Sequence, residues 1–343
     1  MPYATLRSLG AIVYIEALAL NISVKNPVLL ISVVALGALA QSPRLRTADG
    51  HSDLQGTWTN ATMTLLERPI GLGRSTTLTE EEARKFEKDI AKEGSADRRD
   101  GLPQVDVGRG YNELFFDHGS GLARVNGDVR TSIIVDPPDG HLPPFTPEAW
   151  RRLADANAYA QKHPADRAQD RSLAERCLLW AAEPPMLPAP YNSTYQIVQT
   201  PKYVMILIEM MHDVRIIPLD GSPHLPPDVR QWMGDARGHW EGATLVVDTT
   251  NFTDKASLDG SDQNLHVTER FTRVDANTIL YNFTIDDPTT FLNSWTGELP
   301  FVATPGPVYE YACHEDNRAL VDILRGARAQ EKQQEQLEKK GER

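Results

Sequence analysis

The side chains best suited to acid–base chemistry in this sequence are acids on predicted strands in the second half of the chain. Strand alternation places Glu269 on the same face as the apolar residues Val267 and Phe271. In another strand it places Glu209 on the face of Leu207. A carboxyl group desolvated in this way needs a partner, because otherwise its pKa rises and it becomes a candidate general acid or base.

Both carboxyl groups have a structural alternative, which is a buried ion pair with Arg215 or Arg270. A further polar segment, 212–215 (HDVR), joins two predicted strands directly after the strand that carries Glu209. A barrel presents functional groups to a ligand at its rim, where its strands are joined. We therefore expect this segment to lie beside a binding site.

A second polar segment, 234–241 (GDARGHWE), gathers an acid, a base, an imidazole and an indole around two glycines. Its candidate residues are Asp235, Arg237, His239 and Trp240. It is predicted to be a loop, and we weigh two interpretations of it. One is a binding loop, and the other is a tight turn in which the acid caps backbone amides and the indole is buried.

These candidates lead to three functional hypotheses. The first is a small-molecule-binding barrel for an apolar or aromatic ligand with an acidic group, which arginines orient. Its predicted binding residues are Asp213, Arg215, Asp235, Arg237, Trp240 and Trp295, with Trp232 as a further apolar wall. The second is a cofactor-independent lyase, isomerase or hydrolase in the same cavity, with candidate catalytic residues Glu269, His212, His239 and Glu209. The third is a structural envelope protein without a small-molecule site.

Metal, nucleotide and nucleic-acid chemistry find little support in the sequence. The acids of this region and its histidines would supply enough metal ligands; the histidines are His212, His224, His239, His266 and His314. However, HExxH, HxH and Cys/His spacings are absent, so we predict no metal site. GxSxG, GxxxxGK[ST] and GxGxxG are absent as well, so we predict no cofactor. A net charge of −12 repels nucleic acid and excludes it as a predicted partner.

The N-terminal segment has the composition of an export signal. Residues 28–40 (VLLISVVALGALA) form a continuous apolar run, which is shorter than the roughly 20 residues that span a bilayer. The run ends in small residues at 38 and 40, as signal peptidase requires, and Lys25 supplies a positive charge upstream. We predict a signal peptide over 1–40, a periplasmic or secreted protein, and no stable membrane span after processing.

Two alternatives to this export signal stay open. The apolar run is also compatible with a buried helix, or with a membrane anchor formed together with 10–20. The segment 1–23 carries a second apolar patch that an export signal does not need, so translation is hypothesised to begin at Val24. Mass spectrometry of the precursor tests this start, because any peptide from before Val24 excludes it.

The sequence has two cysteines, Cys177 and Cys313, both after the predicted cleavage site. In an oxidising compartment such a pair is expected to form one disulfide, which closes a loop of more than a hundred residues. The alternative is two separate buried thiols. Neither cysteine lies in a CxxC or metal-binding spacing.

The elements that must position these residues are mostly strands. From residue 191 onward, predicted strands cover 193–199, 202–211, 214–219, 244–250, 265–274, 278–285, 295–302 and 308–314. An earlier strand is predicted over 54–65, and helices over 79–93, 147–162, 171–180 and from 317 onward. Close spacing and short connections predict a mainly β fold, an antiparallel meander that forms a barrel or half-barrel with a few peripheral helices.

The predicted organisation is one domain between two terminal segments. A signal peptide covers 1–40, a polar linker 41–53, a single β-rich domain with helical insertions 54–325, and a charged, frayed tail 326–343. A small-molecule ligand or substrate is the predicted partner, and the oligomeric state stays open.

Several segments of the chain resemble a family of exported, largely uncharacterised bacterial proteins that is numerous in soil bacteria. The segments are 130–144 (RTSIIVDPPDGHLPP), 175–178 (ERCL), 195–209 (YQIVQTPKYVMILIE), 212–226 (HDVRIIPLDGSPHLP), 234–255 (GDARGHWEGATLVVDTTNFTDK), 269–288 (ERFTRVDANTILYNFTIDDP) and 309–315 (YEYACHE). The resemblance implies export and this β-rich architecture, and it carries over no catalytic residue. The WEG-TLVV hairpin pattern is also similar to calycin-like barrels, lipocalins among them.

Overall fold

The computed structural model describes residues 45–95, 97–99, 101, 112–255, 258, 260–315 and 317–341. These residues belong to one compact unit, Arg44–Arg343. The predicted signal peptide, 1–40, and the alternative start at Val24 lie outside the described residues. Within those residues, no helix has the length and apolar character that a membrane span requires.

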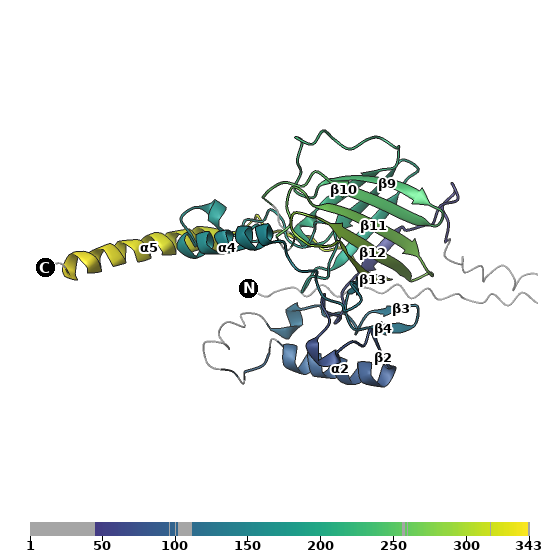
Figure 1. Ribbon diagram of the computed structural model, residues 1–343, viewed down its shortest axis with the longest axis horizontal. Coiled ribbons are helices and arrows are strands. Elements are labelled where there is room, and N and C mark those ends of the chain that lie inside the picture. Colours follow the sequence, from purple (N-terminus) through teal and green to yellow (C-terminus); the bar gives the residue numbers. More distant parts are fainter. Residues whose placement is uncertain are drawn as a thin grey trace, which may run out of the picture. The chain divides into compact units, whose positions relative to one another are not determined.

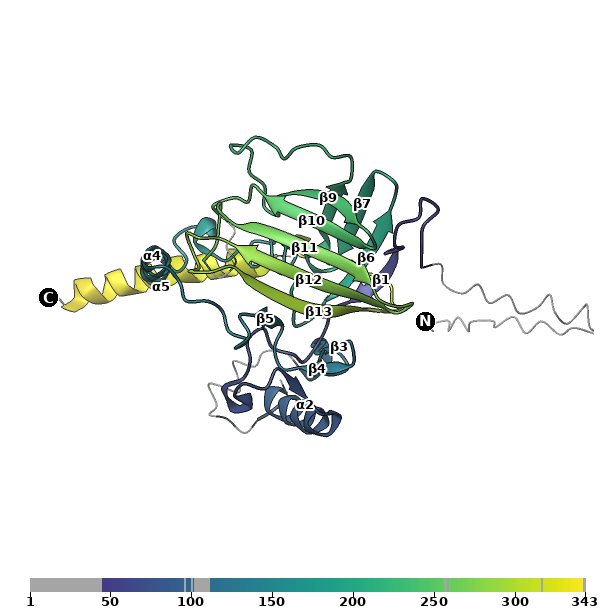
Figure 2. The same cartoon turned by 45° about the vertical axis from the view of Figure 1, so that its right-hand side comes forward.

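One antiparallel sheet curls into a nearly closed barrel, which confirms the predicted fold class (Figure 1 and Figure 2). Its strand order is β8-β7-β6-β1-β13-β12-β11-β10-β9, and β5 pairs with β13 beside this path. The strands are β1 Gly56–Thr59, β5 Ile134–Asp136, β6 Thr194–Gln199, β7 Tyr203–Ile208, β8 Val214–Pro218, β9 Asp235–Glu241, β10 Thr244–Thr250, β11 His266–Arg273, β12 Thr278–Asp286 and β13 Trp295–Ala303. The two end strands, β8 and β9, lie beside each other without being paired by backbone hydrogen bonds.

Alternation along the strands builds the core inside the barrel. In β12 the buried residues are every second one, Ile279, Tyr281, Phe283 and Ile285. Strand residues point alternately to the two faces of a sheet, so this row faces the interior and the residues between face outward. Aromatic rings fill much of the interior, with Tyr281 and Phe301 at a centroid distance of 5.1 Å.

A glycine in β13 makes room for one of these rings. A Cβ atom at Gly297 would lie 2.2 Å from Cζ of Phe283, its cross-strand partner. Gly297→Ala is therefore expected to lower the free energy of unfolding by about 1–3 kcal/mol through overpacking. Urea unfolding measures the loss, with Gly71→Ala as a control, because Gly71 has no left-handed φ and its Cβ would meet no neighbour within 4 Å. A Gly297→Ala variant as stable as the native chain would contradict this packing.

Helices and a small sheet lie outside the barrel strands. The α-helices are α2 Glu80–Gly94, α4 Pro147–Lys162 and α5 Arg318–Gly341, and the short 3-10 helices are Ile70–Leu72, Glu113–Phe115, Ala168–Asp170 and Met210–His212. A three-stranded sheet contains β2 Thr77–Leu78, β3 Arg124–Val125 and β4 Asp128–Arg130. Thr79 begins α2 with a capping box to Glu82, as the sequence predicts.

Four predicted elements differ from the structure. Residues 171–180 form turns in place of a helix, and Cys177 has a left-handed φ of 54° that a helix does not allow. Residues 308–314 form no strand, because β13 before them already has sheet partners on both sides. The predicted loop 234–241 is mostly β9, whose small and polar residues hid its alternation. The tail predicted to fray continues α5 to Gly341.

Candidate functional site

The barrel interior holds a buried ion pair between β8 and β11. The guanidinium of Arg215 donates two hydrogen bonds to the carboxylate of Glu269, one of them over 2.9 Å from Nη1 to Oε1. Both side chains are shielded from solvent, with exposed fractions of 2% and 0%. Tyr281 donates its hydroxyl hydrogen to Glu269 over 2.8 Å and accepts one from the backbone N–H of Met186 over 2.9 Å. Burial and the charge of Glu269 raise the pKa of Tyr281 well above its usual value.

This network bears on whether Glu269 is a general acid or base or the structural partner of an ion pair. The residue faces the interior, as alternation predicts, but both its oxygens are engaged and no solvent reaches it. A bidentate pair with a guanidinium fixes the geometry of this carboxyl group. The structure thus shows Glu269 as the ion-pair partner of Arg215, and a catalytic role for it stays a prediction.

Glu209 directly follows β7 and begins a turn, and the face of Leu207 on which it was predicted is the less buried face of this strand. Its Oε1 accepts a hydrogen bond from Asn192 over 2.6 Å, while buried Oε2 has no hydrogen-bond partner among the described residues. The chain then turns through Met211 and His212, which have left-handed φ values of 58° and 56°. His212 is exposed, and no described contact joins its ring to Glu209. The turn therefore separates these two candidate catalytic residues.

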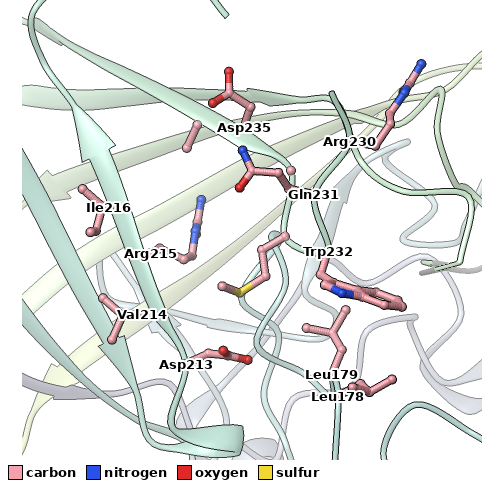
Figure 3. Close-up of a pocket in the computed structure, with 13 residues that line it drawn as sticks. Leu178, Leu179, Asp213, Val214, Arg215, Ile216, Arg230, Gln231, Trp232 and Asp235 are labelled. Atoms are coloured by element: carbon pink, nitrogen blue, oxygen red, sulfur yellow. The ribbon is translucent and has the colours of Figure 1, made fainter. Parts of the chain in front are cut away.

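A cleft of about 530 Å³ opens where β8 and the start of β9 diverge (Figure 3). At the other end of this seam the strands touch, since a Cβ on Gly238 would lie 2.8 Å from Ile217. The cleft is lined by Leu178, Leu179, Asp213, Val214, Arg215, Ile216 and the segment 230–236. Three predicted binding residues, Asp213, Arg215 and Asp235, thus come together there with Trp232.

The charged side chains around the cleft differ in whether they have a hydrogen-bond or ion-pair partner. Arg215 is paired with Glu269, and Asp235 accepts a hydrogen bond from Arg237 over 2.7 Å. Arg230 donates to backbone carbonyl oxygens and points away from the other labelled side chains in Figure 3. The carboxyl group of Asp213, by contrast, has no hydrogen bond or ion pair among the residues that the structure describes. Burial raises the pKa of Asp213, and His212 lowers it by less.

A second acid near the cleft was not singled out from the sequence. Glu183 lies beside Trp232 in a small adjoining pocket that also contains Phe252 and Leu265. Burial raises the pKa of Glu183, and the charge of Asp213 adds to this effect. The signal available in the sequence was a single acid within the otherwise apolar segment 181–187 (AAEPPML).

A chain of histidines and aspartates links the 219–234 connection to the barrel wall. His224 faces Asp235 through Nδ1 at 3.0 Å and Asp248 through Nε2 at 2.9 Å. His266 contacts the other oxygen of Asp248 at 2.6 Å. Within the described part of the chain, no group of three or more acid, histidine or cysteine side chains is arranged to hold a metal ion. Through the contact of His224 with Asp235, these hydrogen bonds hold the cleft wall in place.

This histidine–aspartate pair predicts a pH dependence of stability. The hydrogen bond to Asp248 raises the pKa of His266, so its contribution is complete below 6.5 and is lost as pH rises through the folded-state value. The hydrogen bond to His266 lowers the pKa of Asp248, so that contribution is complete above 3.8 and is lost as pH falls through the lower folded-state value. Both side chains are more than a third exposed, so we expect less than about 1 kcal/mol.

The measurement compares the native chain with His266→Gln by urea unfolding at about pH 5.5 and about pH 9. The variant should be less stable at the lower pH and nearly equal to the native chain at the higher pH. His163→Gln, which removes an exposed pair with Asp166 on another element, serves as the control. An equal deficit of His266→Gln at both pH values would contradict the assignment.

The remaining predicted site residues lie outside the cleft. His239 is exposed on β9 with Glu241 at 3.2 Å, and Trp240 stacks on His51 at a centroid distance of 4.7 Å. Trp295 is fully buried against Phe283 in the core. Arg237 reaches the site only through its pair with Asp235. These residues support the barrel or the cleft wall, and no described contact brings them to Asp213.

The predicted disulfide is present between Cys177 and Cys313, whose Cα atoms are 5.7 Å apart. It joins the segment that carries Leu178 and Leu179 to the chain just before α5. Asn317 donates a hydrogen bond to the backbone carbonyl of Glu175 over 2.7 Å beside it. The apolar wall of the cleft is thus anchored covalently.

No family model, curated protein or solved structure matches this chain. The resemblance to exported proteins of soil bacteria and to calycin-like barrels therefore stays a prediction from the sequence segments.

Proposed function

We propose that this protein binds a small molecule in the cleft between β8 and 230–236. One observation supports the proposal most: apolar side chains and a desolvated, unpartnered carboxyl group, Asp213, share one opening of ligand size. Leu179 and Trp232 offer apolar surface, and Trp232 is 37% exposed, so its indole is accessible to a ligand. A half-buried carboxyl group without a partner has lost part of its hydration and has gained no hydrogen bond in exchange.

The same charges favour a ligand that brings a hydrogen-bond donor. The sequence-based hypothesis of an acidic ligand requires a free arginine, but Arg215 is committed to Glu269 and Arg230 to backbone carbonyls. Asp213 and Glu183 form no ion pair among the described residues, although Glu183 accepts a hydrogen bond from the backbone N–H of Ala182 over 3.0 Å. An ammonium or hydroxyl donor would relieve their desolvation, whereas a carboxylate would add to the repulsion. We therefore assign the ligand class as apolar or aromatic molecules with an amine or hydroxyl group.

The experiment is a titration of tryptophan fluorescence with 2-phenylethylamine and related amines, with phenylacetate as the matched acid. Quenching should saturate for the amines and disappear in Trp232→Phe. Trp150→Phe is the control, because Trp150 is exposed on α4 outside the cleft. Quenching that survives in Trp232→Phe, or that is stronger for the acid, would exclude this site or this ligand class.

Neutralising the cleft carboxyl group should weaken amine binding. Asp213→Asn keeps the side-chain shape and removes the charge, so the dissociation constant of a bound amine should rise about tenfold. Isothermal titration calorimetry measures it, with Asp220→Asn, an exposed turn residue, as the matched control. Affinity that is unchanged in Asp213→Asn would remove Asp213 from the binding site.

A second candidate function is acid–base catalysis in the same cleft, favoured by the raised pKa values of Asp213 and Glu183. A carboxyl group whose pKa is raised is a better general acid than an ordinary one, and two such groups lie in the cleft and its adjoining pocket. Under this candidate, Glu183→Gln would abolish turnover of a bound substrate while leaving binding in place. Turnover that persists in both Glu183→Gln and Asp213→Asn would exclude the candidate.

We also propose that the protein works outside the cytoplasm, as the predicted signal peptide and its resemblance to exported proteins imply. The Cys177–Cys313 disulfide is compatible with an oxidising compartment. Expression of the full chain in a bacterium and fractionation of its cells test the proposal. Processed protein in the periplasm or medium supports it, and unprocessed protein in the cytoplasm would overturn it.

A further inference from the structure

The strand that forms one wall of the cleft has a free backbone edge. β8 pairs only with β7, and the bond from the N–H of Ile208 to the carbonyl of Asp213 fixes the alternation of this ladder. The bond from the N–H of Leu219 to the carbonyl of Lys202 has the same parity. Residues 213, 215 and 217 thus bond to β7, so the backbone groups of Val214 and Ile216 point to the open seam. Neither residue has a described backbone partner there.

The sequence of β8 agrees with this assignment. Pro218 pairs with Tyr203 in the ladder, and its alternation puts its missing N–H on the seam side. Proline is tolerated in a sheet where its nitrogen faces away from the neighbouring strand, which is the case at an edge. β8 is therefore built as an edge strand and does not close the barrel by hydrogen bonds.

The outward face beside this edge is apolar. Val214 and Ile216 are 41% and 61% exposed, and the outward row Val198, Met205 and Ile216 crosses three strands without a charge. Natural edges are normally covered, or are protected by outward charges, a proline or an inward-pointing charge, and β8 has the last two in Pro218 and Arg215. The only charged side chain of β8, that of Arg215, points inward to Glu269. The backbone groups of Val214 and Ile216 stay free beside a ligand-sized cleft, so this short stretch of the edge has room for a partner strand.

We propose that the cleft takes an extended peptide segment that adds to β8 as a strand, an inference that rests on the proposed function of the same cleft. The peptide would exchange backbone hydrogen bonds with Val214 and Ile216, as in other cases of strand addition. An apolar side chain would meet Trp232 and Leu179, and an amine, from a lysine or a free N-terminus, would meet Asp213. β9 touches β8 at Ile217, so pairing would be confined to 214–216, which a segment of roughly five residues is long enough to cover.

The peptide side of the test uses N-methylation, which removes a backbone donor but keeps charge and side chains. The probe is the fluorescein-labelled pentapeptide Lys-Val-Thr-Val-Thr, with one version methylated at positions 2 and 4 and another at positions 3 and 5. Only alternate residues of an added strand bond to its neighbour. One methylated version should therefore bind about tenfold more weakly than the other, as measured by fluorescence anisotropy with the full chain. Equal binding of the two versions would overturn strand addition.

The protein side of the test compares Ile216→Pro with Ile216→Ala. Both lose the side chain, but only the proline loses the N–H that points to the seam, and the ladder to β7 stays intact. Ile216→Pro should bind the pentapeptide about tenfold more weakly than Ile216→Ala, with a similar melting temperature. Similar affinities would remove the backbone edge from the site. If the proline variant unfolds, the pair of methylated peptides still decides the question.

The outcomes separate this inference from the proposed function. If 2-phenylethylamine binds at Trp232 and no pentapeptide binds, the proposal of strand addition is overturned and the proposed small-molecule site stands. If neither the amine nor the pentapeptide binds, both the proposed function and the proposal of strand addition are overturned. Sedimentation equilibrium of the chain alone supplies one further outcome: a dimer abolished by Ile216→Pro would assign the edge of β8 to a second copy and overturn the peptide.

Discussion

Arg215→Ala is expected to lower the free energy of unfolding by about 3–5 kcal/mol, the largest effect of any single substitution considered for this chain. The variant leaves the Glu269 carboxylate buried in the barrel with only the hydroxyl of Tyr281 to compensate it. An unpaired charge in an apolar interior is far more costly than the pair itself, because its lost hydration is not replaced. Chemical unfolding in urea, followed by circular dichroism, measures the change.

The double variant Arg215→Met with Glu269→Leu is the matched control, since it removes both charges together. Apolar replacement of a buried pair is often neutral, so the double variant should recover most of the stability lost by Arg215→Ala. The reversed order, a double variant less stable than the single one, would show that the pair itself stabilises the fold. A loss of less than about 1 kcal/mol in Arg215→Ala would place the pair in contact with solvent.

Removal of the disulfide is expected to have the second large effect. Cys177 and Cys313 are 136 residues apart, and a cross-link over so long a loop restricts the unfolded chain strongly. In the chain-entropy description, replacing both cysteines by serine lowers the free energy of unfolding by about 4–5 kcal/mol. Differential scanning calorimetry of the oxidised chain and the double variant measures the loss.

Reduction of the native chain with dithiothreitol serves as the control for this prediction. It should lower the melting temperature by about as much as the double serine variant does, because both break the same cross-link. The reducing agent should leave the double variant unaffected. Reduced and oxidised native chains with the same melting temperature would contradict the bond or its effect on the unfolded state.

Alternation was enough to predict the barrel and the inward direction of Glu269. In β11 the buried residues are Val267, Glu269 and Phe271, and the residues between them are less buried. The same period failed to indicate β9, because Ala236 and Gly238 are too small to mark an apolar face. A row of apolar side chains signals a strand, whereas a glycine that makes room for Ile217 and Leu219 does not.

The cleft was harder to predict, because it depends on which strands end the sheet. Asp213 was predicted at a rim, but only the strand order shows that it lies at an open seam. Pro218 was the one local sign of an edge strand. Trp295 was expected in the binding wall and lies in the core, since an indole next to a strand has no feature that tells these positions apart. Glu183 was missed because its desolvation arises from distant packing around Trp232.

Nuclear magnetic resonance of the 15N-labelled full chain tests the central claim, a binding site between β8 and 230–236, most directly. The indole signal of Trp232 is assigned by its loss in Trp232→Phe, and that of Trp150 likewise. During titration with 2-phenylethylamine, the Trp232 signal should shift to saturation while the Trp150 signal stays in place. A bound amine that leaves the Trp232 signal unmoved would contradict the claim, as would shifts confined to other indoles.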